Sequence, residues 1–311
     1  MDARGKSDTY LPILWKITAV KSLHTFVGLG EVLWDVFPTG PRFGGAPANF
    51  CCSVASLLND QAEVWMVSAV GDDDLGERAI RSLQENGVGT KYMQVAPQAT
   101  GRVDIELDDS GIATYEFAED SAWDHLRWNP DLQRLASRTD AVCFGTLGQR
   151  NEATKQVIRR FLAGVPETAL KVFDINLRPP FFSDEVIEHS LQLCNVLKLN
   201  DSELPVLRKQ YQLPDSAEQA IRTLADRFDL SCVVYTCGAD GAACLRDDRY
   251  TTVSSEPVEV IDTVGAGDAF TAAFVAGLLA NTGTEALLRK ASRVAAYVCS
   301  QPGATPKGIL L

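Results

Sequence analysis

The chain has 311 residues, 46% of them hydrophobic, which is enough to bury the core of one large α/β domain or of two smaller domains. Its formal net charge is −12, with the acidic residues spread along the chain. This argues against nucleic-acid and anionic-membrane partners, because such partners need a basic surface.

The N-terminal residues 1–23 contain a short apolar stretch that Lys16 interrupts, with no small-residue cleavage site after it. We therefore expect an N-terminal extension rather than a signal peptide. No stretch reaches the roughly 20 apolar residues that a membrane-spanning helix needs. These features predict a cytoplasmic protein that does not enter a membrane.

Cysteines and histidines show no metal-binding pattern. None of the eight cysteines forms a Cys-x-x-Cys pair, and His24, His125 and His189 are far apart in the sequence. Isolated cysteines in such a chain are typical of small apolar core residues in a reducing compartment. The sequence therefore predicts buried free thiols and disfavours a zinc enzyme.

The first predicted strand, residues 26–37, is apolar except for Glu31 and Asp35. Acids in a buried strand are costly unless they are paired or lie at the carboxyl end of the strand, where α/β sheets bind ligands. Asp35 is expected at that end and is therefore a candidate ligand-binding residue.

A glycine-rich loop at 40–45 leads into a predicted helix over 46–58. Gly44 and Gly45 remove side chains where a ligand could approach the backbone, although two glycines before a helix often form a plain turn. Asn49, in the first turn of the helix, offers both a donor and an acceptor. These three residues are further candidates for ligand binding.

A strand at 64–70 and a helix at 75–86 follow, and then the pattern changes. Residues 102–107 alternate strictly between apolar and polar, 109–111 read as a turn, and 112–117 return as a second strand. Alternation indicates an antiparallel hairpin with one solvated face. Within an α/β chain, such a hairpin predicts a small flap beside the main sheet.

The remaining chain repeats a strand–helix order, which predicts a parallel, doubly wound sheet with right-handed crossovers. The expected strands are 141–144, 172–175, 196–199 and 232–235, and the expected helices are 152–162, 184–194, 216–228 and 285–300. Polar residues recur where these strands end, at the edge that faces a ligand crevice. They are Asp174, Asn176, Arg178, Asn200, Glu203, Thr236, Gly238 and Gly241.

Residues 262–268, Asp-Thr-Val-Gly-Ala-Gly-Asp, precede an apolar helix over 269–280. A glycine turn opening a helix favours anion binding, because the first-turn N–H groups are unpaired. Asp268 would repel a phosphate there, and the role of general base for an attacking hydroxyl explains its presence. The alternatives are an ordinary helix cap or a dinucleotide fingerprint, but Phe270 occupies the position of the fingerprint's third glycine.

From about His24 to Gly308 the chain resembles the ribokinase (PfkB) family of carbohydrate kinases. The resemblance rests on residues 44–49, Gly-Gly-Ala-Pro-Ala-Asn, and on 262–268, in the order typical of the family. It implies a ribokinase-like three-layer α/β/α sandwich over residues 24–308. It also implies a small β-sheet lid formed by segments at about 36–43 and 91–118.

The resemblance further implies an enzyme that uses ATP and Mg²⁺. Asp268 would be the general base, and the amides of Gly265, Ala266 and Gly267 would form the anion hole. Substrate hydroxyls would be held by Asp35, Gly44, Gly45 and Asn49. The nucleotide would be held by Asn200, Glu203, Thr236, Gly238, Gly241 and Ser292, with Glu203 acting on Mg²⁺ through water.

Many family members also use a monovalent cation such as K⁺ beside the anion hole. The matching positions are Asp262, Val264, Val298 and Gly303, while Lys307 stands where the family often has a small hydroxyl side chain. The resemblance therefore implies a K⁺ site at these positions, with Lys307 as a departure from the family pattern.

The substrate expected from the resemblance is D-fructose, phosphorylated to fructose 6-phosphate, because residues 30–38 look most like those of fructokinases. Residues 174–178 occur in fructokinases and in 2-keto-3-deoxygluconate kinases, and Arg178 would pair with a phosphate or, in the second group, with a substrate carboxylate. Alternatively, Arg178 forms an ordinary surface salt bridge. A catalytically silent homologue acting as a binding protein is a further alternative. The family's lids often pair between subunits, so a homodimer through the lid is expected.

Overall fold

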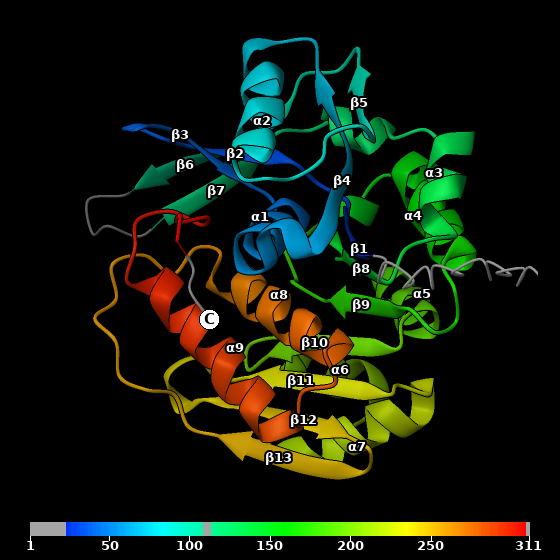
Figure 1. Cartoon of the computed structure of the whole chain (residues 1–311), viewed down its shortest axis with the longest axis vertical. Helices are drawn as coiled ribbons and strands as arrows, with labels where there is room; N and C mark the ends of the chain where they lie inside the picture. Colours follow the sequence, from blue (N-terminus) through cyan, green and yellow to red (C-terminus); the bar gives the residue numbers. More distant parts are fainter. Residues whose placement is uncertain (1–22, 108–112, 309–311) are drawn as a thin grey trace, which may run out of the picture.

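The computed structural model of the protein describes residues 23–107 and 113–308 (Figure 1). The hairpin turn predicted at 109–111 and nearly all of the predicted N-terminal extension lie outside these residues. Among the described residues, nine strands form a large sheet and four form a separate small sheet. The expected sandwich with a lid is confirmed.

The large sheet has the strand order β13-β12-β11-β10-β9-β8-β1-β4-β5. The strands from β11 to β5 are parallel, as predicted, whereas β12 and β13 are antiparallel to their neighbours. After β1 the chain first builds one side of the sheet and later returns at β8 to build the other. Such a switch point leaves a ligand crevice at the carboxyl ends of the strands. The strands are β1 (His24–Leu29), β4 (Ala62–Gly71), β5 (Met93–Ala96), β8 (Ala141–Phe144), β9 (Leu170–Asp174), β10 (Val196–Asn200), β11 (Cys232–Thr236), β12 (Ala242–Arg246) and β13 (Arg249–Val253).

Helices cover both faces of this sheet, and a separate apolar cluster lies under each helical layer. One layer holds α1 (Ala46–Leu58), α2 (Asp74–Glu85), α8 (Ala266–Leu279) and α9 (Thr284–Cys299). The other holds α3 (Pro130–Ala136), α4 (Glu152–Gly164), α5 (Asp184–Leu193), α6 (Leu204–Tyr211) and α7 (Ala217–Phe228). Figure 1 shows α1, α8 and α9 side by side on one face.

The small sheet is the lid, with strand order β3-β2-β6-β7. Its strands are β2 (Leu33–Phe37), β3 (Gly40–Gly44), β6 (Gly101–Leu107) and β7 (Ala113–Phe117). Because β5 pairs with β4 in the large sheet, the lid segment expected from residue 91 starts instead at Gly101.

The single strand predicted at 26–37 is wrong. Gly30, with φ of 143°, interrupts it, so that β1 stays in the large sheet and β2 begins the lid. A backbone at this φ strongly favours glycine, and one such residue lets the chain change sheets. Asp35 therefore lies on the lid, and not at the carboxyl end of the first strand.

The sequence did not predict strand β5, the β12–β13 hairpin, or the helices α3 and α6. Asp247 and Asp248, both at positive φ, form the tight turn of that hairpin. All eight cysteines are free, and six of them are buried. No helix in the described ranges has the length and apolar content to span a membrane.

Candidate active site

The glycine turn at the start of α8 is held closely by the C-terminal loop. Gly265 is the N-cap, with φ of 79°, and a Cβ there would lie 2.5 Å from the carbonyl oxygen of Ala304. Any other residue would have to displace backbone. The Ala266 N–H makes a long contact of 3.3 Å to the Thr263 carbonyl, while the helix start leaves its other first-turn N–H groups available to an anion.

Asp268 lies in this first turn and remains half-buried rather than turned into the core. Its Oδ2 accepts a hydrogen bond of 2.9 Å from Nδ2 of Asn49, so two motifs far apart in sequence meet here. Burial, together with the negative charge of Asp174, raises the pKa of Asp268 to about 7. The hydrogen bond from Asn49 and the positive charges of Lys198 and Arg178 act in the opposite direction and lower this pKa. A carboxyl group with such a pKa can accept a proton near neutral pH.

A buried ion pair lies under this turn. Nζ of Lys198 is 3.0 Å from Oδ1 of Asp174, and Oγ1 of Thr271 donates to the other oxygen of Asp174 at 2.8 Å. A Cβ on Gly267 would be 3.3 Å from the Lys198 ammonium, which places that charge beside the predicted anion hole. Burial opposes the ammonium charge, but Asp174 and Glu203 keep the pKa of Lys198 above its usual value.

Lys198 was not singled out from the sequence. The available signal was a lysine in the middle of the apolar strand β10, Val-Leu-Lys-Leu-Asn. A charge in such a strand requires a partner, and the partner is Asp174 on the adjacent strand β9.

Glu31, the other charged exception of the first predicted strand, is 2% exposed at the junction between β1 and the lid. Burial and the nearby Asp268 raise the pKa of Glu31 to about 7, while Arg178 and the amides of Glu31 and Ala46 lower it. Its Oε2 has no hydrogen-bond partner among the described residues. Gly45 is required beside it, because a Cβ there would lie 2.6 Å from the Glu31 carbonyl.

Asp35 reaches the site from lid strand β2. A Cβ on Gly44 would lie 2.9 Å from Oδ2 of Asp35, so this glycine gives the carboxylate room. Burial raises the pKa of Asp35 to about 6, with Asp262 also raising it and Arg178 and Arg42 lowering it. A cavity of about 340 Å³ lies between this part of the lid and residues 302–305.

The residues expected around K⁺ are only partly brought together. Asp262 accepts hydrogen bonds from the N–H groups of Val264 (3.0 Å) and Gly303 (3.1 Å) and pairs with Nη1 of Arg42 at 3.3 Å. Val298 is buried in α9, and the Lys307 carbonyl accepts a bond from Tyr297 Oη. A carboxylate with three donors, one of them a guanidinium, does not fit the role of a cation ligand. No cluster of three acidic, histidine or cysteine side chains suited to a metal occurs in the described ranges.

Asn200 and Glu203 form a compact turn after β10. Oδ1 of Asn200 accepts bonds from the N–H groups of Ser202 and Glu203. Its Nδ2 group is therefore the part of the side chain that remains available to a ligand. The Glu203 carboxylate accepts from the N–H groups of Asn200 (2.8 Å) and Leu177 (3.1 Å). Burial raises the pKa of Glu203 while Lys198 lowers it. Glu203 thus ties the end of β10 to the loop after β9.

The expected nucleotide loop follows β11. A Cβ on Gly241, which has φ of 108°, would lie 2.0 Å from the Val253 carbonyl, and Gly238 has φ of 51°. A cavity of about 400 Å³ beside this loop extends to Arg289 of α9. Ser292 lies half-buried one turn further along α9, and Thr236 ends β11. The loop, Ser292 and this cavity therefore lie on the same side of the molecule.

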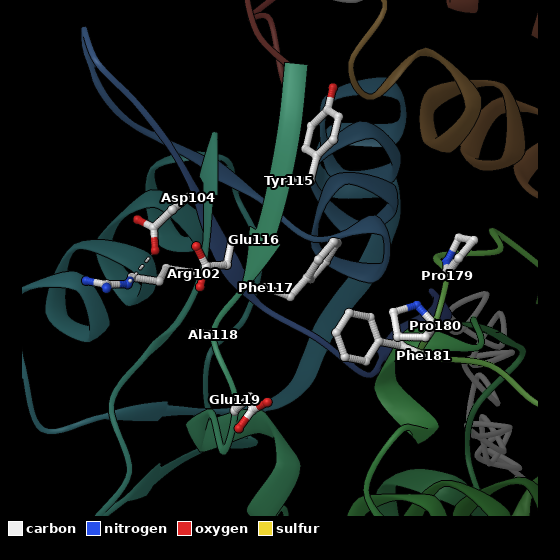
Figure 2. A pocket seen from close by; sticks show the side chains of 10 residues that line it. All are labelled: Arg102, Asp104, Tyr115, Glu116, Phe117, Ala118, Glu119, Pro179, Pro180 and Phe181. Atoms are coloured by element: carbon white, nitrogen blue, oxygen red, sulfur yellow. Dashed lines mark ion pairs between the residues drawn. The ribbon is translucent and has the colours of Figure 1, made fainter. Parts of the chain in front are cut away.

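Arg178 is exposed after β9, yet its positive charge lowers the pKa of Glu31, Asp35 and Asp268. The Arg178 guanidinium is therefore close enough to influence the charge of all three acids. Beside it, a cavity of about 490 Å³ separates β7 from residues 179–181, with the rings of Phe117 and Phe181 5.1 Å apart (Figure 2).

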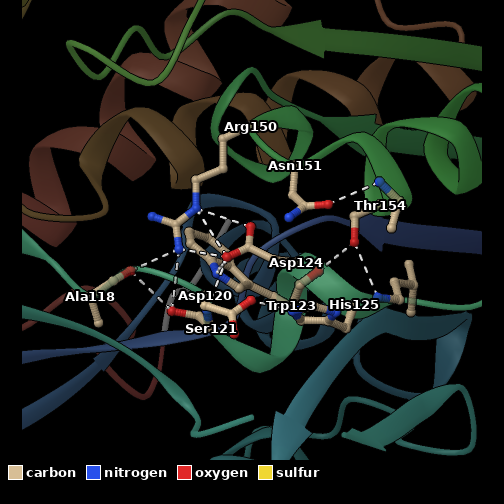
Figure 3. Close-up of polar contacts among 11 residues, drawn as sticks. Ala118, Asp120, Ser121, Trp123, Asp124, His125, Arg150, Asn151 and Thr154 are labelled. Atoms are coloured by element: carbon tan, nitrogen blue, oxygen red, sulfur yellow. Dashed lines mark hydrogen bonds and ion pairs between the residues drawn. The ribbon is translucent and has the colours of Figure 1, made fainter.

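Arg150 contacts the chain segment that follows lid strand β7. Its guanidinium pairs with Asp124 at 2.6 Å, donates to the Ala118 carbonyl, and lies over the ring of Trp123 (Figure 3). These contacts fasten the chain leaving the lid to the start of α4, which makes Arg150 a structural residue.

The chain is similar to known proteins over most of its length. Residues 25–309 match the model of the pfkB family of carbohydrate kinases. The fructokinase of Salmonella typhimurium is 27% identical over 296 residues, covering 91% of this chain and 94% of its own. That of Klebsiella pneumoniae is 28% identical with the same coverage.

Among solved structures, the ATP-bound fructokinase of Xylella fastidiosa superposes with a TM-score of 0.78 at 23% identity, covering 90% of this chain and 94% of its own. The fructokinase of Vibrio cholerae, bound to fructose, ADP and calcium, gives 0.76 at 24% identity, covering 91% and 95%. At these identities the two structures support the fold. The family match over nearly the whole chain establishes that this protein belongs to the pfkB family of carbohydrate kinases.

Proposed function

We propose that the protein transfers the γ-phosphoryl group of ATP to a hydroxyl of a small sugar, D-fructose, giving fructose 6-phosphate. The observation that carries this proposal is Asp268, a half-buried carboxylate with a pKa of about 7 at the mouth of the α8 amide turn. Its bond to Asn49 places it next to a second group that can bind a sugar hydroxyl.

In the proposed reaction, Asp35 and Asn49 orient the sugar so that one hydroxyl faces Asp268. As the sugar oxygen bonds to the γ-phosphorus, the bond to the β–γ bridging oxygen breaks and ADP leaves. The hydroxyl proton passes to Asp268 and then to solvent. The amides of Gly265, Ala266 and Gly267, with the Lys198 ammonium beside them, stabilise the charge on the moving phosphoryl group.

The nucleotide would lie across the Gly238–Gly241 loop, near Thr236 and Ser292. Mg²⁺, when bound, neutralises the phosphates and orients them for in-line transfer. Because both Glu203 oxygens already accept backbone hydrogen bonds, we propose that Glu203 acts on Mg²⁺ through water. The Nδ2 group of Asn200 is free to donate to a phosphate.

Fructose is favoured because the curated relatives described above are fructokinases. A specific observation keeps 2-keto-3-deoxygluconate as a second candidate: Arg178 is exposed and acts on three acids of the site, so it could also pair with a substrate carboxylate. A silent homologue is less well supported, because the general base and the glycine turn are both intact.

The test is ADP release with Mg-ATP over a panel of fructose, ribose and 2-keto-3-deoxygluconate, for the wild type and Asp268→Asn. We expect fructose to be preferred and the variant to lose about 10²- to 10⁴-fold in kcat, with its sugar affinity retained. Asp226→Asn, at an exposed acid of α7, is the matched control and should behave as wild type. Preference for the keto acid would select the second candidate, and wild type without ADP release on any sugar would support the silent homologue.

Two further expectations stay predictions. The lid has an edge strand, β7, whose Tyr115 is 60% exposed, and we propose that it contributes to a homodimer. A cytoplasmic location likewise remains a prediction.

A further inference from the structure

Arg42 joins the lid to the body of the protein. It lies on β3, in register with Asp35 on β2, and its guanidinium stacks on the ring of Phe37 at 4.5 Å. From there its Nη1 reaches Oδ2 of Asp262, 3.3 Å away. Arg42 is thus a lid side chain that contacts the first residue of the turn that leads to the anion hole.

Asp262 is the residue that joins the loops around that turn. Its oxygens accept from Val264 N–H and Gly303 N–H, and its own N–H donates to the Cys299 carbonyl. Ala304, next to Gly303, in turn packs against Gly265. The Asp262 side chain is only 16% exposed, so its negative charge needs a partner to remain there.

We propose that Arg42 is a positioning residue that neutralises Asp262 from the lid, so that its guanidinium takes the place of a bound monovalent cation beside the proposed anion hole. The inference rests on the proposed kinase function. Arg42 also faces Asp35, and it lowers the pKa of that carboxyl group. One guanidinium therefore connects the sugar-binding acid of the lid with the loop that positions the phosphoryl-transfer site.

The competing explanation is an ordinary surface ion pair, since the Arg42 side chain is 49% exposed. Such pairs contribute about 0–1 kcal/mol and can be removed without consequence. The two explanations differ at Arg42→Gln. A surface pair predicts unchanged turnover, whereas a positioning role predicts a lower kcat that an added cation can restore.

The experiment compares wild type, Arg42→Gln and Arg42→Lys in buffers whose only added monovalent cation is choline, K⁺ or guanidinium. The matched control is Arg78→Gln, because Arg78 also stacks on a lid ring, Trp34 at 4.7 Å, and pairs with an exposed acid, Asp74, on α2. We measure kcat, KM for the sugar and the melting temperature.

We expect wild type and Arg78→Gln to have the same kcat in choline as in K⁺. Arg42→Gln should lose about 10-fold in kcat in choline and recover part of it with K⁺ or millimolar guanidinium, and Arg42→Lys should fall between the two. K⁺ should raise the melting temperature of Arg42→Gln and leave that of wild type unchanged, because only the variant has an open site at Asp262.

Two results would overturn the inference: a wild-type melting temperature that rises in K⁺ over choline, or an Arg42→Gln variant that matches Arg78→Gln in every buffer. The melting experiment needs no turnover. Wild type that phosphorylates no sugar, yet shows the expected melting behaviour, would therefore count against the proposed function while supporting the role of Arg42 at Asp262.

Discussion

The two halves of the proposed site are built by different means. The sugar half, around Asp35, Glu31 and Asp268, consists of carboxyl groups whose pKa burial raises to about 6 or 7. The nucleotide half, from Thr236 to Gly241, consists of backbone turns at positive φ with few charged groups. The proposed catalysis thus depends on side chains in the sugar half, whereas the nucleotide half is shaped mainly by its backbone.

This difference has a physical reason. A sugar is uncharged and must be oriented and deprotonated, which requires polar side chains with suitable pKa values. A nucleotide in this fold already carries its charge, and a backbone loop can accommodate it without side chains that would need partners of their own. Substitutions in the two halves should therefore change different kinetic constants.

After the loss predicted above for Asp268→Asn, the largest effect is expected at Lys198, where the two halves meet. Lys198→Met leaves Asp174 buried without its partner and removes the charge beside the anion hole. Breaking a buried pair costs about 3–5 kcal/mol, and kcat should fall about 10²- to 10³-fold. Urea unfolding and steady-state kinetics measure the two effects separately.

The double variant Lys198→Met with Asp174→Asn sharpens this test. Removing both charges should recover most of the lost stability, because no unpaired charge remains buried. It should not recover kcat, because the ammonium beside Gly267 is still missing. Recovery of both quantities would mean that Lys198 has only a structural role.

An intermediate effect is expected at Gly241 in the nucleotide half. In Gly241→Ala, the new Cβ would meet the Val253 carbonyl at 2.0 Å, so the loop must shift. We expect KM for ATP to rise about 10-fold with KM for the sugar unchanged. Gly283→Ala is the matched control, because nothing lies within 4 Å of its Cβ. A rise in the sugar KM instead would contradict the division into two halves.

The smallest effect on kcat is expected at Asn49, whose proposed contact with the sugar should instead appear as a raised KM for the sugar at every pH. Its hydrogen bond lowers the pKa of Asp268, so Asn49→Leu should raise that pKa further. The general base works only when deprotonated, and kcat in wild type should therefore fall as pH drops through about 7. In the variant this fall should begin at higher pH, with kcat at pH 9 much less affected. A pH profile of kcat that stays in place would exclude the hydrogen bond as a control on the base.

Much of the architecture could be predicted because local pattern determines it. The strand–helix alternation from residue 141 onward gave most of the parallel strands at nearly their observed limits. The glycine turns could also be located from local sequence, as glycines directly before a helical pattern. The structure explains these glycines, because a Cβ on Gly44, Gly45 or Gly265 would strike neighbouring atoms.

What could not be predicted depends on contacts between distant segments. The chain passes from the large sheet to the lid at Gly30 because β2 pairs with β6. No local signal distinguishes this arrangement from one continuous strand. Lys198 pairs with Asp174 on another strand, and Arg42 pairs with Asp262, a residue 220 positions away. Neither pairing can be recognised from the residues that adjoin it in the sequence. Asp35 stays a predicted ligand-binding residue, although it lies in the small sheet and not at the end of the first strand of the large sheet.

The way in which the first lid hairpin is attached has a consequence for substrate choice. Three residues separate β1 from β2, and β3 leads directly into α1, so this hairpin is anchored firmly at both ends. Its side chains Asp35 and Arg42 can hardly shift without moving the central sheet or the helix that carries Asn49. The second hairpin, β6–β7, joins the body through longer connections, so changes in its length or sequence could adapt the protein to new sugars while the reacting groups stay in place.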